Sequence, residues 1–373
     1  MTAFAFLTAT EILFGRGKAA EAAPRVAAFG SQVFLLHGTP ARADWLAEAL
    51  AGQGCTVSRF VVNGEPDIAM IEAATQAAKR AQVVVALGGG AVIDAGKAVA
   101  AMVPANRPLL DHLEVIGKSL PLDQAPLPFV ALPTTAGTGA EVTRNAVIGS
   151  PAHQRKVSLR DKRMLPALAI IDPALTDHTP KSITLASGLD AITQVIEPYI
   201  CTRANRLTDA LCRDAIPLGL RALRRLMVRE DAAARDDMVW VSLCGGLALA
   251  NAGLGVIHGL AGPLGGLIAA PHGAICGTLL PHGLALNAER AADPARIHQV
   301  IGWIAEAFET TPENALETLT DWSRRNGLPR LAQMGFTPHH LQQAAEAAAT
   351  SSSMQANPVR LAPADLAILM ARA

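Results

Sequence analysis

The chain of 373 residues has few aromatic side chains, which make up only 4% of the sequence. A platform on which the bases of a nucleic acid could stack is therefore not expected. Charged residues are also scarce, at 17%, and the 32 basic and 32 acidic residues cancel to a formal net charge of zero. Because no basic cluster is present either, the composition argues against a nucleic-acid partner.

The sequence also lacks paired cysteines and long apolar runs. Its five cysteines stand singly, with no C-x-x-C pair, and this is typical of the reduced cytoplasm rather than of a disulfide-bonded secreted protein. No apolar run reaches the roughly 18 residues of a membrane span, and the first residues lack the basic segment of a signal peptide. We expect a cytoplasmic protein without a membrane partner.

Hydrophobic residues, by contrast, are abundant. They make up 50% of a chain that is longer than one hydrophobic core normally serves, so two domains are expected. Hydrophobic content this high also favours a homo-oligomer, with a dimer as the first expectation. The substrate-binding surface is expected to lie in the cleft between the two domains.

Short apolar runs alternate with amphipathic stretches in the first half of the chain. Helices are predicted at 43–52 and 67–80, and strands are predicted at 33–36, 57–62, 83–87, 129–132 and 168–171. This alternation indicates βαβ units and a parallel, Rossmann-like sheet. After Pro180 only helical spacing remains, at 185–200, 205–227 and 232–254. The predicted fold is therefore an α/β domain, residues 1–178, followed by an all-helical domain, residues 179–373.

A run of three glycines, Gly88, Gly89 and Gly90, follows the predicted strand 83–87. Without side chains at this turn, the backbone can approach a ligand, and the first amides of the next helix can bind phosphate oxygens. The turn therefore predicts a pyrophosphate site at the carboxyl end of a strand. A tight turn that binds no ligand is the alternative, because the run is not a G-x-G-x-x-G fingerprint.

Three residues of the helical half form a candidate metal site: Asp190, His258 and His272. One carboxylate and two imidazoles suit Zn²⁺ or Fe²⁺ and leave a position open for a substrate oxygen. Each residue also has a simpler interpretation. Asp190 follows Gly188 at what reads as a helix start, where the dipole favours an acidic residue, and the histidines are interpretable as core residues in glycine-rich surroundings.

Four motifs in this order resemble the iron-containing (group III) alcohol dehydrogenase family: GGGAVIDAGK (88–97), PTTAGTGAEVT (133–143), SGLDA (187–191), and His258 followed by PHG (271–273). The resemblance spans almost the whole chain. It implies a dehydroquinate synthase-like fold, and hydride transfer between NAD or NADP and a small alcohol or aldehyde. It also implies the cofactor-contacting positions, which are Gly38, Gly88, Gly89, Gly90, Asp94, Lys97, Thr134, Thr135, Thr138, Asn145 and Lys156.

The chain departs from the family pattern at two positions of the metal site. Gln194 stands where most members have a second histidine ligand, one helical turn after Asp190. We expect it to be at most a weak ligand, because an amide oxygen binds Zn²⁺ or Fe²⁺ less well than imidazole does. Gly262 stands where a histidine linked to proton transfer is usual, so water, His282 or a ribose hydroxyl would have to replace it.

The cofactor site departs from the pattern at the end of the first predicted strand. NAD-preferring members tend to have an acidic residue there, whereas this chain has the residues HGTPAR (37–42). Nothing in that segment repels a 2′-phosphate, and Arg42 could pair with one, so NAD and NADP both remain open.

Three functions are therefore compared. The leading one is a metal-assisted NAD(P)-dependent dehydrogenase or aldehyde reductase, in which Asp190, His258 and His272 hold the cation. The second is a metal-independent, maleylacetate reductase-like reduction of an unsaturated keto acid. The third is a cofactor-binding protein that has lost catalysis, which only Gln194 and Gly262 support.

Overall fold

The computed structural model describes residues 3–268 and 270–373, and these divide into two compact units. The first is a sheet unit of residues 8–135 and 139–177. The second is a helical unit that contains residues 178–373 together with 136–138 and the N-terminal segment as far as Leu7. The parallel-sheet and all-helical architecture predicted from the sequence is confirmed.

The sheet unit is built on six parallel strands in the order β1-β8-β5-β4-β2-β3. These strands are β1 Ile12–Phe14, β2 Gln32–His37, β3 Thr56–Val61, β4 Val83–Gly88, β5 Phe129–Pro133 and β8 Leu168–Ile171. All five predicted strands are present, with bounds within a residue or two. Strand β1 was not predicted, because this three-residue edge strand is too short to show a hydrophobic pattern.

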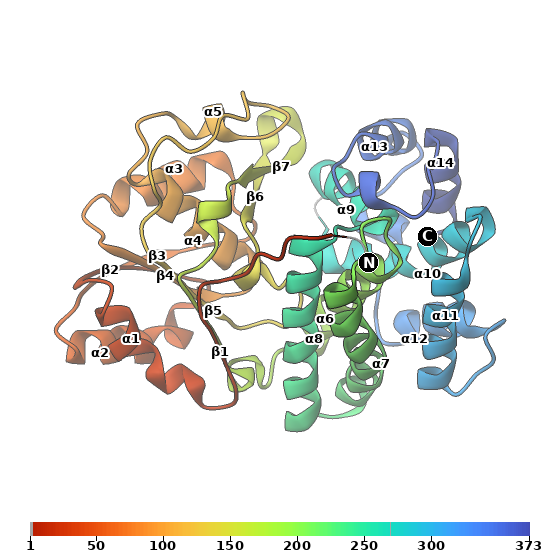
Figure 1. Ribbon diagram of the computed structural model, residues 1–373, viewed down its shortest axis with the longest axis horizontal. Helices are drawn as coiled ribbons and strands as arrows, with labels where there is room; N and C mark the ends of the chain where they lie inside the picture. The colour runs from red at the N-terminus through yellow and green to blue at the C-terminus, as the bar shows by residue number, and fades with distance from the viewer. Residues whose placement is uncertain (1–2, 269) are drawn as a thin grey trace. The chain divides into compact units, whose positions relative to one another are not determined.

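Helices cover both faces of this sheet (Figure 1). On one face α1 (Ala22–Ala27) and α2 (Asp44–Gly52) pack on alternate strand residues such as Leu35 and Val85. On the other face α3 (Ile68–Ala77) and α4 (Gly90–Met102) pack on the intervening residues, such as Phe34 and Ala86. Both faces of the central strands are therefore apolar, as parallel sheets require.

An antiparallel hairpin accompanies the sheet, with strands β6 (Asn145–Ser150) and β7 (Arg155–Arg160). The short helix α5 (Leu109–His112) also belongs to this unit. The sequence analysis missed the hairpin, because polar and charged residues interrupt both of its strands. Ile148 and Leu159 are nevertheless buried and belong to the same core cluster as α3 and α4.

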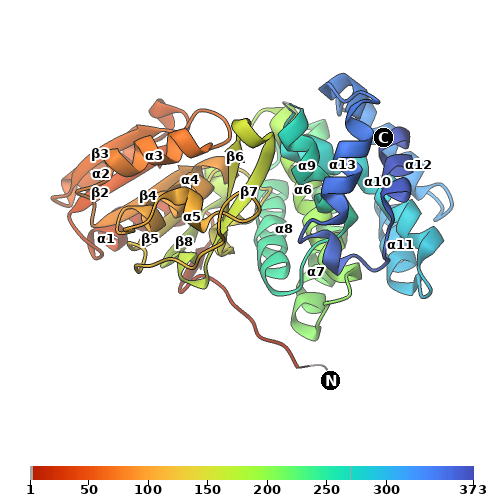
Figure 2. The ribbon, with the colours of Figure 1, turned by 90° about the horizontal axis from the view of Figure 1, so that it is seen from above.

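Among its described residues the helical unit contains nine α-helices: α6 Lys181–Ile200, α7 Arg206–Val228, α8 Ala232–Asn251, α9 Val256–Leu267, α10 His272–Arg290, α11 Ala295–Phe308, α12 Ala315–Arg325, α13 His340–Ala349 and α14 Pro363–Arg372. Helix α6 is central and packs against α7, α8 and α10 (Figures 1 and 2). One predicted helix, 232–254, is shorter than expected, because the chain turns after Asn251 and starts α9 at Val256.

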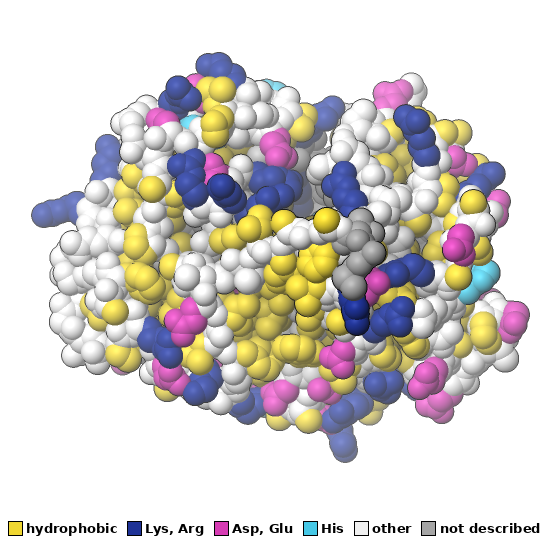
Figure 3. Space-filling model, viewed as in Figure 1, with side chains coloured by type: hydrophobic (Ala, Val, Ile, Leu, Met, Phe, Trp, Pro, Cys, Tyr) yellow, Lys and Arg dark blue, Asp and Glu magenta, His cyan; other side chains and the backbone are white. Residues whose placement is uncertain are grey.

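No single helix in the described ranges is long and apolar enough to cross a membrane. Helices α8 and α9 together meet the length and composition criteria as a bent pair, with an angle of 96° between them. On the face of the molecule shown in Figure 3, basic and acidic side chains are interspersed.

Candidate functional site

The order of the strands defines a binding position within the sheet unit. From β2 the chain passes outward to β3 and then returns to β4 on the other side of β2. The connection that leaves β2 therefore runs toward one edge of the sheet, and the connection that leaves β4 runs toward the other. Open α/β sheets bind their ligands at the carboxyl ends of two neighbouring strands whose connections diverge in this way. Gly38 follows β2, and the glycine turn ends β4, so both predicted segments lie at this point.

The glycine turn approaches its neighbours closely. A Cβ atom on Gly88 would lie 2.5 Å from a methyl carbon of Val92, so any larger residue would force this turn apart. Helix α4 starts at Gly90, and no side chain caps its first turn. The amides at this end of the helix remain available to an anion.

The threonine motif follows β5, the next strand in the sheet. Thr134 donates its backbone amide to the carbonyl oxygen of Gly88 at 3.0 Å, which fixes the motif beside the glycine turn. Thr135 lies at the end of the same segment. Thr138, in contrast, groups with the helical unit, where its carbonyl oxygen accepts a hydrogen bond from Gln194.

Asp94 and Lys97 connect α4 to the hairpin. The Lys97 ammonium is fully buried and donates to the carbonyl oxygen of Ala140 at 3.0 Å, to Thr143 Oγ1 at 2.9 Å and to the carbonyl oxygen of Asn145. It also forms an ion pair with Asp94. The structure thus uses both side chains to hold β6 on α4, and direct cofactor contact by Asp94, Lys97 and Asn145 stays a prediction.

The charged residues near β2 include one that the sequence analysis missed. Arg42 donates to the carbonyl oxygen of Leu175 at 2.8 Å. Arg59, on the edge strand β3, donates to Asp44 Oδ1 at 2.7 Å and to the carbonyl oxygen of Pro40 at 2.9 Å. It therefore lies against the segment that follows β2. A single arginine within a predicted strand does not indicate from the sequence that its side chain will lie against the segment after β2.

The remaining predicted cofactor residue, Lys156 on β7, forms an ion pair with Glu65. Its side chain is only 11% exposed, so it is not a freely solvated lysine.

Asp190, in the helical unit, occupies the middle of α6, so the expectation that it starts a helix is wrong. The expectation rested on Gly188, which was interpreted as the residue before a helix but lies inside α6. This glycine allows close packing of two helices, because a Cβ atom there would lie 2.6 Å from a methyl carbon of Leu223 on α7. Asp190 is 2% exposed, and helix-dipole stabilisation at a first turn does not account for a buried carboxylate in this position.

His258 lies near the start of α9, and Glu197 of α6 fixes its orientation. The imidazole Nδ1 lies 2.6 Å from Glu197 Oε2, and Glu197 also accepts the backbone amide of Ile257 at 2.6 Å. Asn357 Oδ1 accepts the neighbouring amide of Val256 at 2.9 Å. Gly255 is required here, since its Cβ would lie within 2.9 Å of both acceptor side chains. With its proton on Nδ1, His258 presents the Nε2 lone pair to Asp190.

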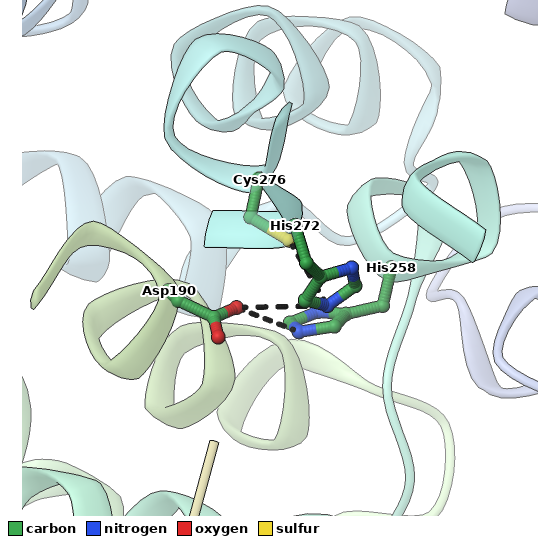
Figure 4. Close-up of side chains that lie close together, drawn as sticks. All are labelled: Asp190, His258, His272 and Cys276. Carbon is green, nitrogen blue, oxygen red and sulfur yellow. Dashed lines mark hydrogen bonds and ion pairs between the residues drawn. The ribbon is translucent and has the colours of Figure 1, made fainter. Parts of the chain in front are cut away.

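His272 is the first residue of α10 and completes the predicted set. Asp190 Oδ1 lies 3.4 Å from His258 Nε2 and 3.8 Å from His272 Nε2 (Figure 4). Cys276 lies one turn later on α10, with Sγ 3.6 Å from His272 Nε2. The ligand atoms of these four residues all lie within 4.8 Å of one another. The structure therefore brings the three predicted residues together and adds Cys276, which the sequence had not indicated as a ligand.

The electrostatics of this cluster favour positive charge. Burial acts to lower the pKa of both imidazoles, but their interactions with Cys276 and Asp190 outweigh it, so the pKa of His258 lies well above its ordinary value and that of His272 rises to about 8. Burial acts to raise the pKa of Asp190, yet the two imidazoles lower it overall.

A divalent cation fits this arrangement. Asp190 Oδ1 and His258 Nε2 are buried and have no hydrogen-bond partner among the described residues. Buried polar atoms are rarely left unpaired, so two that face each other beside the second imidazole, that of His272, indicate a cation between them. Carboxylate, imidazole and thiolate are all ligands of Zn²⁺, and imidazole also suits iron.

The structure also shows the surroundings of Gln194 and Gly262, the two positions that depart from the family pattern. Gln194 directs its amide nitrogen to the carbonyl oxygen of Thr138 at 2.7 Å. Gly262 lies one turn after His258 on α9, and a Cβ atom there would meet nothing within 4 Å. His282 lies ten residues after His272 on the same helix, about 15 Å along its axis, which is too far for a direct proton relay.

Comparison with known proteins identifies the family of this chain. The family model for iron-containing alcohol dehydrogenase matches residues 9–173, and the C-terminal model of the same family matches residues 184–373. Alcohol dehydrogenase 4 of Schizosaccharomyces pombe is 32% identical over 329 residues, which cover 86% of this chain and 77% of the relative. The 1,3-propanediol dehydrogenase of Klebsiella pneumoniae is 34% identical over 290 residues, covering 75% and 73%.

Among solved structures, a 1,3-propanediol oxidoreductase superimposes with a TM-score of 0.88 at 28% identity, and the match covers 100% of both chains. The fold and the metal-compatible cluster define a class, the metal-assisted nicotinamide-dependent oxidoreductases. The chain belongs to the iron-containing alcohol dehydrogenase family. It is thus an NAD(P)-dependent oxidoreductase that interconverts alcohols and aldehydes.

Proposed function

We propose that Asp190, His258 and His272 hold the catalytic cation of this enzyme. The observation that carries the proposal is that the buried atoms Asp190 Oδ1 and His258 Nε2 face each other without a hydrogen-bond partner among the described residues, with His272 beside them. When bound, the cation supplies a Lewis acid for the substrate oxygen, and the nicotinamide supplies or accepts the hydride. Glu197 keeps the proton of His258 on Nδ1, so that Nε2 remains a ligand.

The cofactor is assigned to the first part of the chain, residues 1–178, and the metal and substrate to residues 179–373. The glycine turn and the start of α4 bind the pyrophosphate, and Gly38 leaves room beside β2 for the adenosine ribose. Thr134, Thr135, Thr138, Asn145 and Lys156 bind the remainder of the cofactor. Asp94 and Lys97 contribute by holding β6 in place, as their contacts support.

Proton exchange at the substrate oxygen is assigned to water. Gly262 offers no proton-transfer group, and His282 is too distant along α10. The His272 side chain is 32% exposed, which gives water access to one side of the metal site.

The substrate is proposed to be a small alcohol or aldehyde, and short diols and hydroxyaldehydes are the first to assay because one relative is a 1,3-propanediol dehydrogenase. We also propose that the protein is a cytoplasmic homodimer. Its five cysteines are all buried free thiols, in keeping with a reducing compartment. Light scattering and cell fractionation test these two assignments.

The site assignment is tested with protein purified without chelator. Replacing His272 (His272→Ala) should remove most bound metal and reduce aldehyde reduction by about a hundredfold or more, while His298→Ala, an exposed position on α11, should change neither. Unchanged metal content and turnover in His272→Ala would reject the assignment. Reduction of maleylacetate that persists with chelator would favour the metal-independent alternative.

A further inference from the structure

Cys276 differs from the other four cysteines in what surrounds it. Cys212 and Cys244 lie in the apolar core of the helical unit, where burial raises the pKa of both thiols. Cys276 belongs to the same core cluster and is equally buried, but its Sγ lies 3.6 Å from His272 Nε2 and faces the buried oxygen of Asp190 (Figure 4). Packing alone does not explain why a thiol lies beside the ligand atoms of Asp190, His258 and His272.

Helix geometry accounts for the position of this thiol. His272 and Cys276 are four residues apart on α10, so both side chains lie on one face of the helix. Asp190 and Gln194 have the same spacing on α6. Each helix could therefore supply two ligands. Gln194 directs its amide nitrogen to the carbonyl oxygen of Thr138, and its amide oxygen is a weaker donor to Zn²⁺ than the thiolate of Cys276.

We propose that Cys276 is the fourth protein ligand of the metal, in place of the residue at position 194, and that its sulfur biases the site toward Zn²⁺. This inference rests on the metal site assigned above. Binding breaks the S–H bond and forms a metal–sulfur bond, and the proton passes to water with no change of oxidation state. The resulting set is one carboxylate oxygen, two imidazole nitrogens and one thiolate.

The preference for zinc follows from the type of donor. Thiolate is a soft ligand that occurs commonly at zinc sites, whereas an amide oxygen is a hard one. With four protein ligands, the substrate oxygen would enter as a fifth, which Zn²⁺ accepts during catalysis.

The test is spectroscopic and uses the full-length protein loaded with Zn²⁺ or Co²⁺. X-ray absorption at the zinc edge should show one sulfur at about 2.3 Å beside nitrogen and oxygen neighbours at about 2.0–2.1 Å. The Co²⁺ form should show a sulfur-to-metal charge-transfer band in the near ultraviolet. Both signals should vanish in Cys276→Ala and persist in Gln194→Ala and in the matched control Cys212→Ala.

Metal affinity provides a second measurement. Cys276→Ala should weaken Zn²⁺ binding by about tenfold to a hundredfold, and the ratio of zinc to iron affinity should fall. The double variant Gln194→His/Cys276→Ala should recover most of the affinity without the sulfur signal. If the double variant bound Zn²⁺ no more tightly than Cys276→Ala does, the proposal that Cys276 replaces a ligand at position 194 would be contradicted.

The metal content and the spectrum of the wild-type protein distinguish a wrong role for Cys276 from a wrong metal site. Wild-type protein that binds one metal ion without a sulfur neighbour overturns the role of Cys276 and leaves the other three ligands in place. Wild-type protein that binds no metal under any loading condition overturns both. The wild-type spectrum decides the matter even if Cys276→Ala does not fold.

Discussion

Glu197 Oε2 lies 2.6 Å from Nδ1 of His258, and both side chains are buried. The carboxylate comes from α6, two helical turns after Asp190, so a single helix supplies one of the proposed metal ligands and the group that orients another. Partners of this kind fix the tautomer of a ligating histidine and increase its basicity.

Replacing Glu197 by glutamine should weaken Zn²⁺ binding by about tenfold to a hundredfold, because His258 would lose its charged acceptor. Chelator competition measures the affinity. Glu289→Gln, an exposed position on α10, is the control. Equal affinities in the two variants would show that Glu197 does not support the metal site.

Gly262 should accept a histidine, because the space around its Cβ position is open. We expect Gly262→His to keep or slightly increase the free energy of unfolding, since glycine is a poor helix former. An imidazole one turn from His258 should also raise turnover by at least about tenfold if proton transfer limits the rate. Gly302→His, at an equally open helical position on α11, should show the stability effect alone. Equal turnover in both variants would exclude a relay from position 262.

Glu141 should make stability depend on pH. Burial raises the pKa of its carboxyl from 4.5 to about 7, an effect that the charge of Lys97 only partly offsets. Between these values the folded state holds a proton that the unfolded state has lost, so the free energy of unfolding falls as the pH rises from 4.5 to 7. At 1.36 kcal/mol per pKa unit, the loss is about 3 kcal/mol.

Urea unfolding of Glu141→Gln at several pH values measures this effect. The variant should lack the Glu141 contribution, so the difference in unfolding free energy between variant and wild type should grow in favour of the variant above pH 4.5 and level off above pH 7. A difference that is independent of pH would mean that Glu141 does not titrate in this range.

Arg59 should favour NADP over NAD. Its guanidinium lies against the segment after β2, where a 2′-phosphate would bind, and a charge-assisted hydrogen bond contributes about 1.5–3 kcal/mol. Arg59→Ala should therefore raise the KM for NADP by about tenfold or more and affect NAD much less. Asp44→Asn should shift the preference toward NADP, because it removes the carboxylate that Arg59 now pairs with. A parallel change for both cofactors in Arg59→Ala would contradict this role.

Much of the architecture could be predicted from the sequence, because it depends on local patterns. The buried strands β2, β4, β5 and β8 are apolar runs bounded by turn residues, and the glycine turn after β4 follows from its composition. Segments with mixed polarity, such as β6 and β7, could not be found in this way. Their burial depends on α3 and α4, which lie far from them in the sequence.

In the candidate site, too, some residues could be predicted from the sequence and others could not. Residue types and order alone suggested Asp190, His258 and His272. Glu197 and Cys276 were missed because their importance depends on which helix faces meet, and a single sequence does not specify this. A weak signal was nevertheless present, since Glu197 follows Asp190 by seven residues and Cys276 follows His272 by four, and both spacings place side chains on a common helix face.

The first amides of α9 are held by Glu197 and Asn357, which are 160 positions apart in the chain. The start of α9 is therefore fully capped only after the segment around Asn357 has been synthesised and has folded back onto α9. During biosynthesis, a ribosome-bound chain that ends before this segment would lack a properly capped α9. The proposed metal ligand His258 is therefore expected to lie on a fully capped helix only after the helical unit has been translated.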